Sequence, residues 1–230
     1  MRQLVLDLSP GAPKQLDRFI AGANEEVLHL LRQWLTQPQT EPFVYLWGEP
    51  GAGKSHLLQA LVPHHYFRCD ANLMLQPDPQ PLLALDDVQL LSPAGAVALF
   101  HRFNERRDSQ QRLLTSGPCP PAQLPLAAEV RTRLGWGLVL RVHALNDVQK
   151  QQALQSHAAQ LGAHLPDDSA RYILNHWTRD MTSLFELIQQ LDRWSVSAHR
   201  PVITIPLIRA ALCSLNPDRA TQPISTVQPD

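Results

Sequence analysis

Residues 43–61 read FVYLWGEPGAGKSHLLQAL and decide the fold class. The run FVYLW is apolar, aromatic and β-branched, which predicts a buried strand. The loop at residues 48–55 fits the pattern G-x-x-x-x-G-K-[ST], and Leu57, Leu58 and Leu61 follow at the spacing of one helix face. Because such a loop turns backbone N–H groups and a helix N-terminus towards an anion, the stretch predicts a phosphate-binding loop.

The positions of this loop have different expected roles. Its glycines let the backbone turn around the phosphates, Lys54 is expected to reach the β- and γ-phosphates, and the Ser55 hydroxyl is expected to ligate Mg²⁺. The residues expected at the nucleotide are Gly48, Pro50, Gly51, Ala52, Gly53, Lys54, Ser55 and His56.

Composition sets limits on the class of protein. The 230 residues allow one large domain or two modest ones, and 44% hydrophobic with 18% charged residues is ordinary for a soluble protein. A formal charge of −1 argues against a protein that coats nucleic acid through positive charge. The three cysteines form no C-x-x-C pair, which disfavours a zinc site or a disulfide framework. Without a signal peptide or a run of about 18 apolar residues, we expect a cytoplasmic protein with no membrane contact.

The second motif is LLALDD at residues 82–87. Four apolar residues followed by two carboxylates predict a central strand that delivers its acids to the carboxyl edge of a sheet, where α/β proteins bind ligands. Asp86 is expected to hold the water shell of Mg²⁺, and Asp87 to orient an attacking water.

Further strands are predicted at residues 64–69, 112–116 and 138–142. The strand RLLTS ends in Thr115 and Ser116, whose hydroxyls are candidates for sensing the γ-phosphate or positioning water. Because strands alternate with helices, we expect an α/β fold in three layers around a mainly parallel, five-stranded sheet.

Two helices of this domain carry charged residues. Asn24 is expected to cap a helix whose apolar face holds Val27, Leu28, Leu31 and Leu35. A helix over residues 93–108 is expected to turn its apolar side chains inward and its basic side chains into solvent, with direct DNA contact at the basic face left open. The inward set is Val97, Phe100 and Phe103, and the outward set is Arg102, Arg106 and Arg107.

The alternation of strands and helices stops near residue 146. Helices are predicted at 147–161, 167–177, 180–198 and 206–215. The expected organisation is a terminal peptide and linker at 1–13, a nucleotide-binding α/β domain at 14–145, a helical domain at 146–215, and a polar, Pro-rich tail at 216–230 that we expect to be disordered.

The N-terminal stretch RQLVLDL, residues 2–8, precedes a Pro-Gly-Pro linker. Two interpretations remain open from the pattern. It is either an edge strand of the sheet, or an extended peptide that docks in a groove of another protein, with Gln3 as polar anchor and Leu4, Leu6 and Leu8 as apolar plugs.

Five motifs together resemble those of AAA+ ATPases of the DnaA branch, over about residues 1–215: GEPGAGKS, LALDD, LLTSG, EVRTRLGWG and RDMTSLFELIQQLDR. The resemblance implies a P-loop domain with a Walker A motif at residues 48–55 and a helical lid, binding ADP or ATP with Mg²⁺, with Phe19 and Ile20 near the adenine. The stretch RTRLGWG resembles a box that carries an arginine finger, which implies that Arg133 acts in trans on a site of a neighbouring subunit.

Within this branch the sequence is similar to the DnaA-homologous regulators of replication initiation. DnaA itself continues from the lid into a helix-turn-helix domain, and residues 3–8 resemble the bacterial clamp-binding consensus. The resemblance implies that this peptide docks on the sliding clamp, the β subunit of DNA polymerase III. It also implies that the protein meets DNA only through the clamp and stimulates ATP hydrolysis by DnaA. Association between copies of the chain is a further expectation.

One departure from the family pattern concerns hydrolysis. Thr182 stands where the lid helix usually carries an arginine, and Arg179 lies one helical turn earlier. We therefore expect weak or no ATPase activity of the protein's own. The alternatives are a DNA-dependent ATPase or helicase loader that acts by its own hydrolysis, and a nucleotide-gated scaffold without any hydrolytic role.

Overall fold

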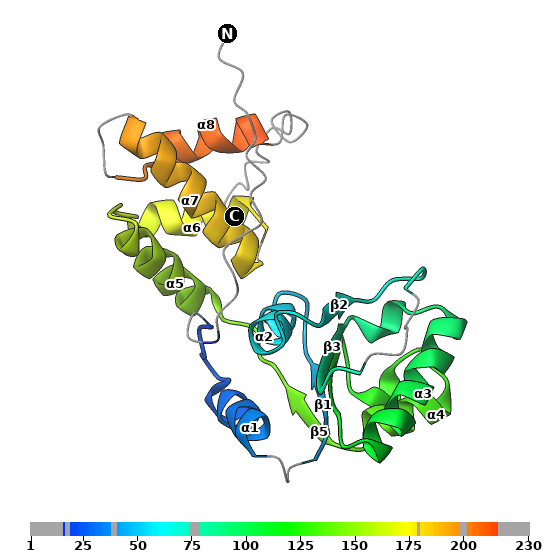
Figure 1. The fold of residues 1–230 in the computed structure, drawn as a ribbon. Helices are drawn as coiled ribbons and strands as arrows, with labels where there is room; N and C mark the ends of the chain where they lie inside the picture. The colour runs from blue at the N-terminus through cyan, green and yellow to red at the C-terminus, as the bar shows by residue number, and fades with distance from the viewer. Residues whose placement is uncertain are drawn as a thin grey trace, which may run out of the picture. The chain divides into compact units, whose positions relative to one another are not determined.

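The computed structural model describes residues 16, 19–37, 41–73, 79–178, 180–197 and 202–215, without the side chains of 195–197, 214 and 215. The chain divides into two compact units, Met1–Ala144 and Leu145–Asp230 (Figure 1). Within the described residues, no helix is both long enough and apolar enough to cross a membrane.

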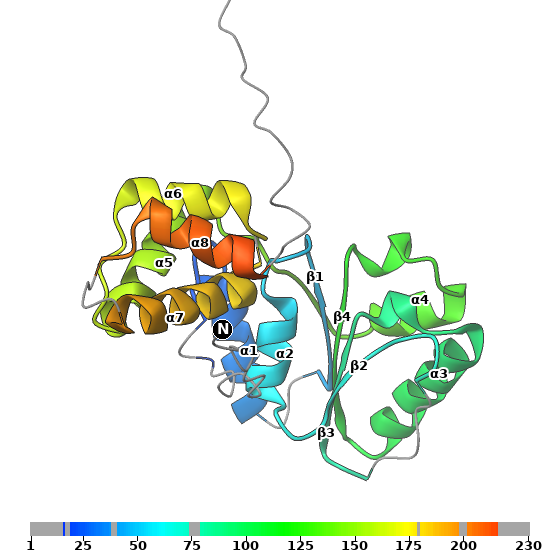
Figure 2. The same cartoon turned by 90° about the horizontal axis from the view of Figure 1, so that it is seen from above.

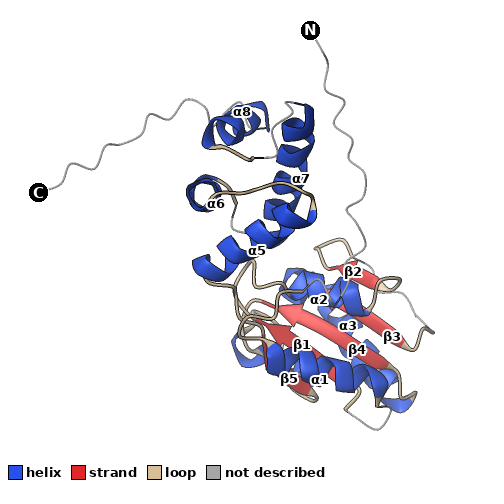
Figure 3. Ribbon diagram, turned by 90° about the vertical axis from the view of Figure 1, so that its left-hand side faces the viewer, coloured by secondary structure: helices blue, strands red, loops and turns tan. Residues whose placement is uncertain are grey.

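A five-stranded sheet forms the centre of the first unit (Figure 3). Its strands are β1 (Phe43–Trp47), β2 (Tyr66–Arg68), β3 (Leu82–Asp86), β4 (Arg112–Gly117) and β5 (Leu138–Arg141). They lie in the order β2-β3-β4-β1-β5, and every pairing is parallel. The predicted α/β fold with a mainly parallel five-stranded sheet is confirmed.

Helices cover both faces of the sheet, as Figure 2 shows. One face carries α1 (Glu25–Thr36) and α2 (Lys54–Leu61), and the other carries α3 (Pro93–Asp108) and α4 (Ala128–Leu134). Two short 3₁₀ turns, Val88–Leu90 and Pro121–Gln123, complete the unit. Successive side chains of a strand point to opposite faces, so β1 packs Val44 and Leu46 against α1 and α2, and Phe43 and Tyr45 against α3 and α4.

The parallel register brings three strand ends together. Leu46 of β1 lies opposite Ser116 of β4, and Leu85 of β3 lies opposite Thr115. The loop after β1, the acids after β3 and the hydroxyls of β4 therefore meet at one edge of the sheet.

The second unit is helical. It contains α5 (Asp147–Gln160), α6 (Asp167–His176), α7 (Met181–Ser197) and α8 (Ile205–Leu215). Side chains from all four helices form its core, among them Leu154, Ile173, Leu184 and Ile208. The segment before α8 is tied to the α5–α6 connection, where the Ile203 N–H donates to the His164 carbonyl at 2.9 Å. The predicted helical domain is confirmed.

The predicted face of α3 is wrong in part: Phe103 is buried and Arg107 is exposed as predicted, but three other residues differ. Val97 was expected inside but is 56% exposed, whereas Arg102 and Arg106 were expected in solvent but are 7% and 0% exposed. Arg106 is buried because its Nη1 donates to two backbone carbonyls, of Gln80 at 3.1 Å and Arg112 at 3.0 Å. The Arg106 guanidinium thus joins the segment before β3 to the start of β4 and has a structural role, so Arg106 is no solvent-exposed contact for DNA.

Several predicted boundaries shift slightly. The strand expected at residues 64–69 is reduced to the three residues of β2, and the limits of the lid helices differ from the predicted ones by at most one residue. The expectations for the N-terminal peptide and for residues 216–230 lie outside the described residues.

Asn24 occupies the N-cap position of α1, but its side chain makes no capping hydrogen bond. Instead, its Nδ2 donates to the His143 carbonyl at 2.9 Å, and its Oδ1 accepts from the His143 N–H at 2.7 Å. Asn24 is fully buried. The Asn24 side chain thus pairs with both the backbone N–H and the backbone carbonyl of a residue 119 positions away. These two hydrogen bonds join the start of α1 to the segment that follows β5.

Asn24→Ala should lower the free energy of unfolding by about 1–3 kcal/mol, because it leaves the partly buried N–H and carbonyl of His143 without their partner. Urea denaturation followed by tryptophan fluorescence measures the change. The exposed Asn175 on α6 supplies the control, and Asn175→Ala should stay within about 0.5 kcal/mol of the parent. A loss below about 1 kcal/mol for Asn24→Ala would show that His143 finds other partners.

Candidate phosphate-binding site

The loop between β1 and α2 needs glycine at two positions for steric reasons. A Cβ on Gly48 would come within 2.2 Å of the Val142 carbonyl oxygen, and one on Gly53 within 2.6 Å of the Phe19 ring. Gly53 also has a φ of +97°, in the left-handed region that favours glycine. The chain therefore turns tightly around the N-terminus of α2, where helix N–H groups face outward.

Lys54 begins α2 and points back into the loop. Its Nζ donates to the Gly48 carbonyl at 2.7 Å and the Glu49 carbonyl at 3.0 Å, and the residue is 9% exposed. Burial lowers the pKa of Lys54, while the charges of Asp87 and Asp86 act in the opposite direction. A positive charge thus lies beside the N-terminal N–H groups of α2, which is the arrangement that a phosphate needs.

Asp86 is the buried acid of the site, with no exposed surface. The Ser116 hydroxyl donates to its Oδ1, and the Tyr66 hydroxyl donates to its Oδ2 at 2.7 Å. Ser116 Oγ in turn accepts the Asp87 N–H at 3.1 Å. Burial and the hydrogen bond to Asp86 raise the pKa of Tyr66 well above its ordinary value, so the phenol remains a donor to the carboxylate.

The carboxylate of Asp87 has partners outside this network, although its N–H donates to Ser116. The φ of Asp87 is +57°, and its carboxylate accepts from Arg68 Nε at 3.2 Å and from Gln89 Nε2 at 3.1 Å. Thr115 is turned away from the network, because its hydroxyl donates to the Val44 carbonyl at 3.2 Å. Of the two predicted hydroxyls of β4, only Ser116 contacts an acid of the site.

Phe19 and Ile20 lie beside the loop, as part of the segment before α1. The Phe19 ring lies 5.8 Å from the His56 ring, centroid to centroid. It also occupies the place where a Cβ on residue 53 would point. Both residues are half-buried. In the second unit Thr182 is half-buried in the first turn of α7, and Arg179 lies outside the described residues.

Arg133 belongs to α4, which covers the opposite face of the sheet from α2. It is half-buried rather than enclosed in the core. The structure therefore does not bring Arg133 together with Lys54 in one chain.

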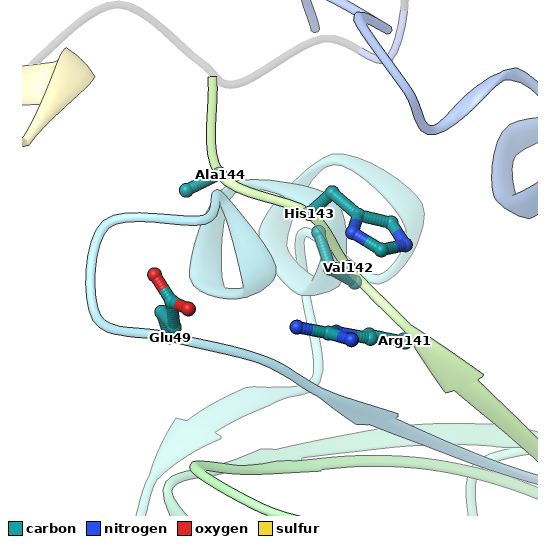
Figure 4. Close-up of a pocket in the computed structure, with 5 residues that line it drawn as sticks. All are labelled: Glu49, Arg141, Val142, His143 and Ala144. Atoms are coloured by element: carbon teal, nitrogen blue, oxygen red, sulfur yellow. The ribbon is translucent and has the colours of Figure 1, made fainter. Parts of the chain in front are cut away.

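A small pocket of about 140 Å³ lies next to the loop. It is lined by Glu49, Arg141, Val142, His143 and Ala144, and Figure 4 shows the side chains of Arg141 and Glu49 pointing towards one another. Arg141 also lies over the Trp47 ring, 5.1 Å from its centroid. This pocket adds groups of both charges to the edge of the site.

Sequence reasoning missed Tyr66 and Arg68, the partners of the two aspartates. Their signal is the pairing of β2 with β3, which places Arg68 opposite Asp86 and Tyr66 opposite Ala84. A three-residue edge strand carries no motif, so only the sheet order reveals them.

The comparisons with known proteins agree with this architecture. Residues 147–212 match the family model described as Hda, lid domain. Domain III of the replication initiation protein DnaA from Thermotoga maritima has a similar structure, with a TM-score of 0.70, 18% identity, and 90% of this chain and 98% of that chain covered. The Holliday junction branch migration motor RuvB from the same organism has a TM-score of 0.65 at 18% identity, covering 90% of this chain and 73% of that one.

A replication initiator DnaA bound to AMPPCP and single-stranded DNA is also similar, with a TM-score of 0.64 and 19% identity over 81% of this chain. The chain spans 66% of the length of that DnaA. The parallel sheet, the loop and the helical unit give this chain the fold of DnaA domain III. The match to the Hda lid family model covers most of its helical unit.

Tyr66→Phe should lower the free energy of unfolding at neutral pH by about 2 kcal/mol, because it removes a hydrogen bond to a buried charge. A raised tyrosine pKa contributes stability that is fully present below the unfolded value of about 10 and is lost as pH rises through the folded pKa. The parent should therefore lose stability faster than the variant above pH ~10, by up to about 1.4 kcal/mol per pH unit.

Urea denaturation between about pH 8 and pH 11 tests this relation, and the gap between parent and variant should narrow across that range. Tyr172→Phe removes a hydroxyl from the helical unit and serves as control, with a change within about 0.5 kcal/mol. If the difference in the free energy of unfolding between parent and variant stayed constant with pH, the loss of stability at high pH would not come from ionisation of Tyr66.

Proposed function

We propose that this protein is a nucleotide-dependent regulator of replication initiation that docks on the DNA-loaded sliding clamp and stimulates ATP hydrolysis by DnaA, which inactivates the initiator. The observation that carries the proposal is the match of residues 147–212 to the lid domain of Hda, next to a DnaA-like α/β unit. The regulated step would be the initiation of DNA replication, in the cytoplasm.

The ligand of the loop is an adenine nucleotide, ADP or ATP. The left-handed Gly53, the buried Lys54 and the N-terminus of α2 fit a phosphate chain. The position of Phe19 beside His56 and Gly53 supports a proposed place for the adenine near Phe19 and Ile20. The solved DnaA with AMPPCP gives a precedent in a protein of the same fold. We propose that loop residues 48–56 hold this nucleotide.

Mg²⁺ would be held by Ser55 and Asp86 together with phosphate oxygens. Within the described part of the chain, no group of three or more His, Cys, Asp or Glu side chains forms a metal site of its own. Asp86 is suited to this role because two hydroxyls fix its carboxylate at the sheet edge. When bound, the ion would neutralise charge on the phosphates, and Asp87 and Ser116 would orient water nearby.

Arg133 is proposed to act on a nucleotide held by DnaA. Arginine supplies a permanent charge and a planar fork of donors that stabilise the transition state of phosphoryl transfer. The half-buried position of Arg133 on α4, outside the chain's own loop, supports an action in trans. Docking through Gln3, Leu4, Leu6 and Leu8 on the clamp stays a proposal, because these residues lie outside the described ones.

Hydrolysis by the protein itself, as a DNA-dependent ATPase or helicase loader, is the second candidate. It is favoured by the ordered pair of Asp86 and Ser116 and by the similarity in fold to the motor RuvB. This alternative requires steady turnover by the isolated protein that DNA accelerates.

Lys54→Ala should weaken the binding of ADP and ATP by about ten- to a hundredfold, since it removes a charge-assisted hydrogen bond to phosphate. Titration with a fluorescent ADP analogue gives the affinity. Arg32→Ala removes one positive charge from the exposed side of α1 and should leave the affinity unchanged. Equal affinities for Lys54→Ala and the parent would refute the phosphate-binding loop.

Arg133→Ala should abolish the stimulation of DnaA, because an arginine finger contributes on the order of a thousandfold or more to the rate of hydrolysis. A single-turnover assay of ATP bound to DnaA, with the clamp loaded on DNA, measures this effect. Nucleotide binding by the variant should equal that of the parent. Stimulation that survives the substitution would exclude Arg133 as the acting group.

The same assay separates the other functions. Deletion of residues 1–8 should abolish binding to the clamp, and with it the stimulation of DnaA, if that peptide docks there. Hydrolysis that occurs only on this protein would favour the second candidate, and no hydrolysis on either protein would indicate a scaffold.

A further inference from the structure

Arg133 is held by three side chains that surround its guanidinium. The guanidinium carbon lies 3.7 Å from the centroid of the Trp136 ring and 4.8 Å from that of Phe100. The Nε of Arg133 donates to Asn104 Oδ1 at 3.3 Å. Phe100 and Asn104 belong to α3, and Trp136 follows α4, so the two helices share this arginine platform of Phe100, Asn104 and Trp136.

The platform leaves the terminal nitrogens of Arg133 uncommitted. Within the described residues, Arg133 forms no ion pair, and its hydrogen bond uses only Nε. Arg106 and Arg112 of the same unit differ, because they donate from their terminal nitrogens to backbone carbonyls. Arg107 also lies over Trp136, at 4.9 Å, but it pairs with Asp108 at 3.6 Å.

This difference has a chemical meaning. Stacking on an aromatic face and one bond from Nε fix the plane of the guanidinium without neutralising its charge. The two terminal nitrogens then form a fork that matches the oxygens of a phosphate. A carboxylate partner, by contrast, would compete with an incoming anion for the same charge.

The platform itself is fixed to the core. Trp136 lies 6.3 Å from Phe43, centroid to centroid, and Phe43 packs edge-on against Phe103 at 5.0 Å. Phe43 and Phe103 are both buried. Because an arginine side chain carries about 2 kcal/mol of rotamer entropy, a rigid support reduces the cost of ordering it in a complex.

We propose that Asn104 and Trp136 are positioning residues that orient Arg133 towards a phosphate held by a partner molecule. Neither touches that phosphate; both act through the guanidinium. This inference rests on the proposed function, in which Arg133 completes a nucleotide site on DnaA.

The test is the pair of variants Asn104→Asp and Asn104→Ala in the single-turnover assay with DnaA and the loaded clamp. N104D places a carboxylate beside Nε. This carboxylate would form an ion pair with the guanidinium of Arg133, so that less of its positive charge is available to a partner's phosphate. We expect the maximal rate of DnaA hydrolysis to fall about fivefold, as for a partly exposed ion pair of about 1 kcal/mol. The concentration of the protein that gives half-maximal stimulation should not change, because docking is untouched. N104A removes the hydrogen bond to Nε without adding a charge, so it should also lower the maximal rate, but by less than N104D. A maximal rate equal to that of the parent would show that Asn104 does not orient Arg133.

Trp136 is tested by the paired substitutions Trp136→Phe and Trp136→Leu. The phenylalanine keeps an aromatic face and should retain most of the maximal rate, whereas the leucine should reduce it despite its apolar character. Binding of the fluorescent ADP analogue confirms that each variant keeps its folded loop. Arg131→Ala is the matched control, since it removes an arginine of the same helix whose Nη1 donates to the Ala122 carbonyl.

The outcomes distinguish this inference from the proposed function. If Arg133→Ala leaves stimulation intact, the proposed function fails and the platform has no role in it. If Arg133→Ala abolishes stimulation but N104D and W136L keep the maximal rate, Arg133 acts without its platform and the inference is overturned. A change only in the half-maximal concentration would assign Asn104 and Trp136 to docking, which also overturns it.

Discussion

The parallel register of β1, β3 and β4 is the constraint on which the site depends. It sets Leu46 level with Ser116 and Leu85 level with Thr115, so that the loop, Asp86 and the Ser116 hydroxyl end at one edge. A shift of one residue would turn every side chain of a strand to the opposite face. The buried alternation of β1, with a different helix layer on each side, excludes such a shift because both of its faces are packed.

Much of this arrangement follows from local sequence. The loop, the five strands and the helical unit could be predicted because each depends on short patterns of apolar residues and turn residues. The partners of the acids could not be predicted in the same way. Tyr66 reaches Asp86 from a three-residue edge strand, and its hydroxyl is meaningful only once the sheet order is known.

The errors on α3 and at Asn24 have a common physical cause. Charged and amide side chains were assigned to solvent or to the nearest helix end, because local patterns contain no distant partner. Arg106 is buried since carbonyls at residues 80 and 112 require donors, and Asn24 is buried since the His143 peptide requires both a donor and an acceptor. Unpaired backbone groups are costly in a core, so such demands can outweigh a residue's usual preference for the surface.

The Asn24 amide also holds the last residues of the first unit. His143 is fastened to the beginning of α1, and the division between the units falls directly after Ala144. Proteolysis at that boundary would thus release a fragment in which the segment after β5 is still hydrogen-bonded to the start of α1. Because both partners of these hydrogen bonds lie in the fragment, the nucleotide loop would keep its neighbours Val142 and Phe19 after the lid had been removed.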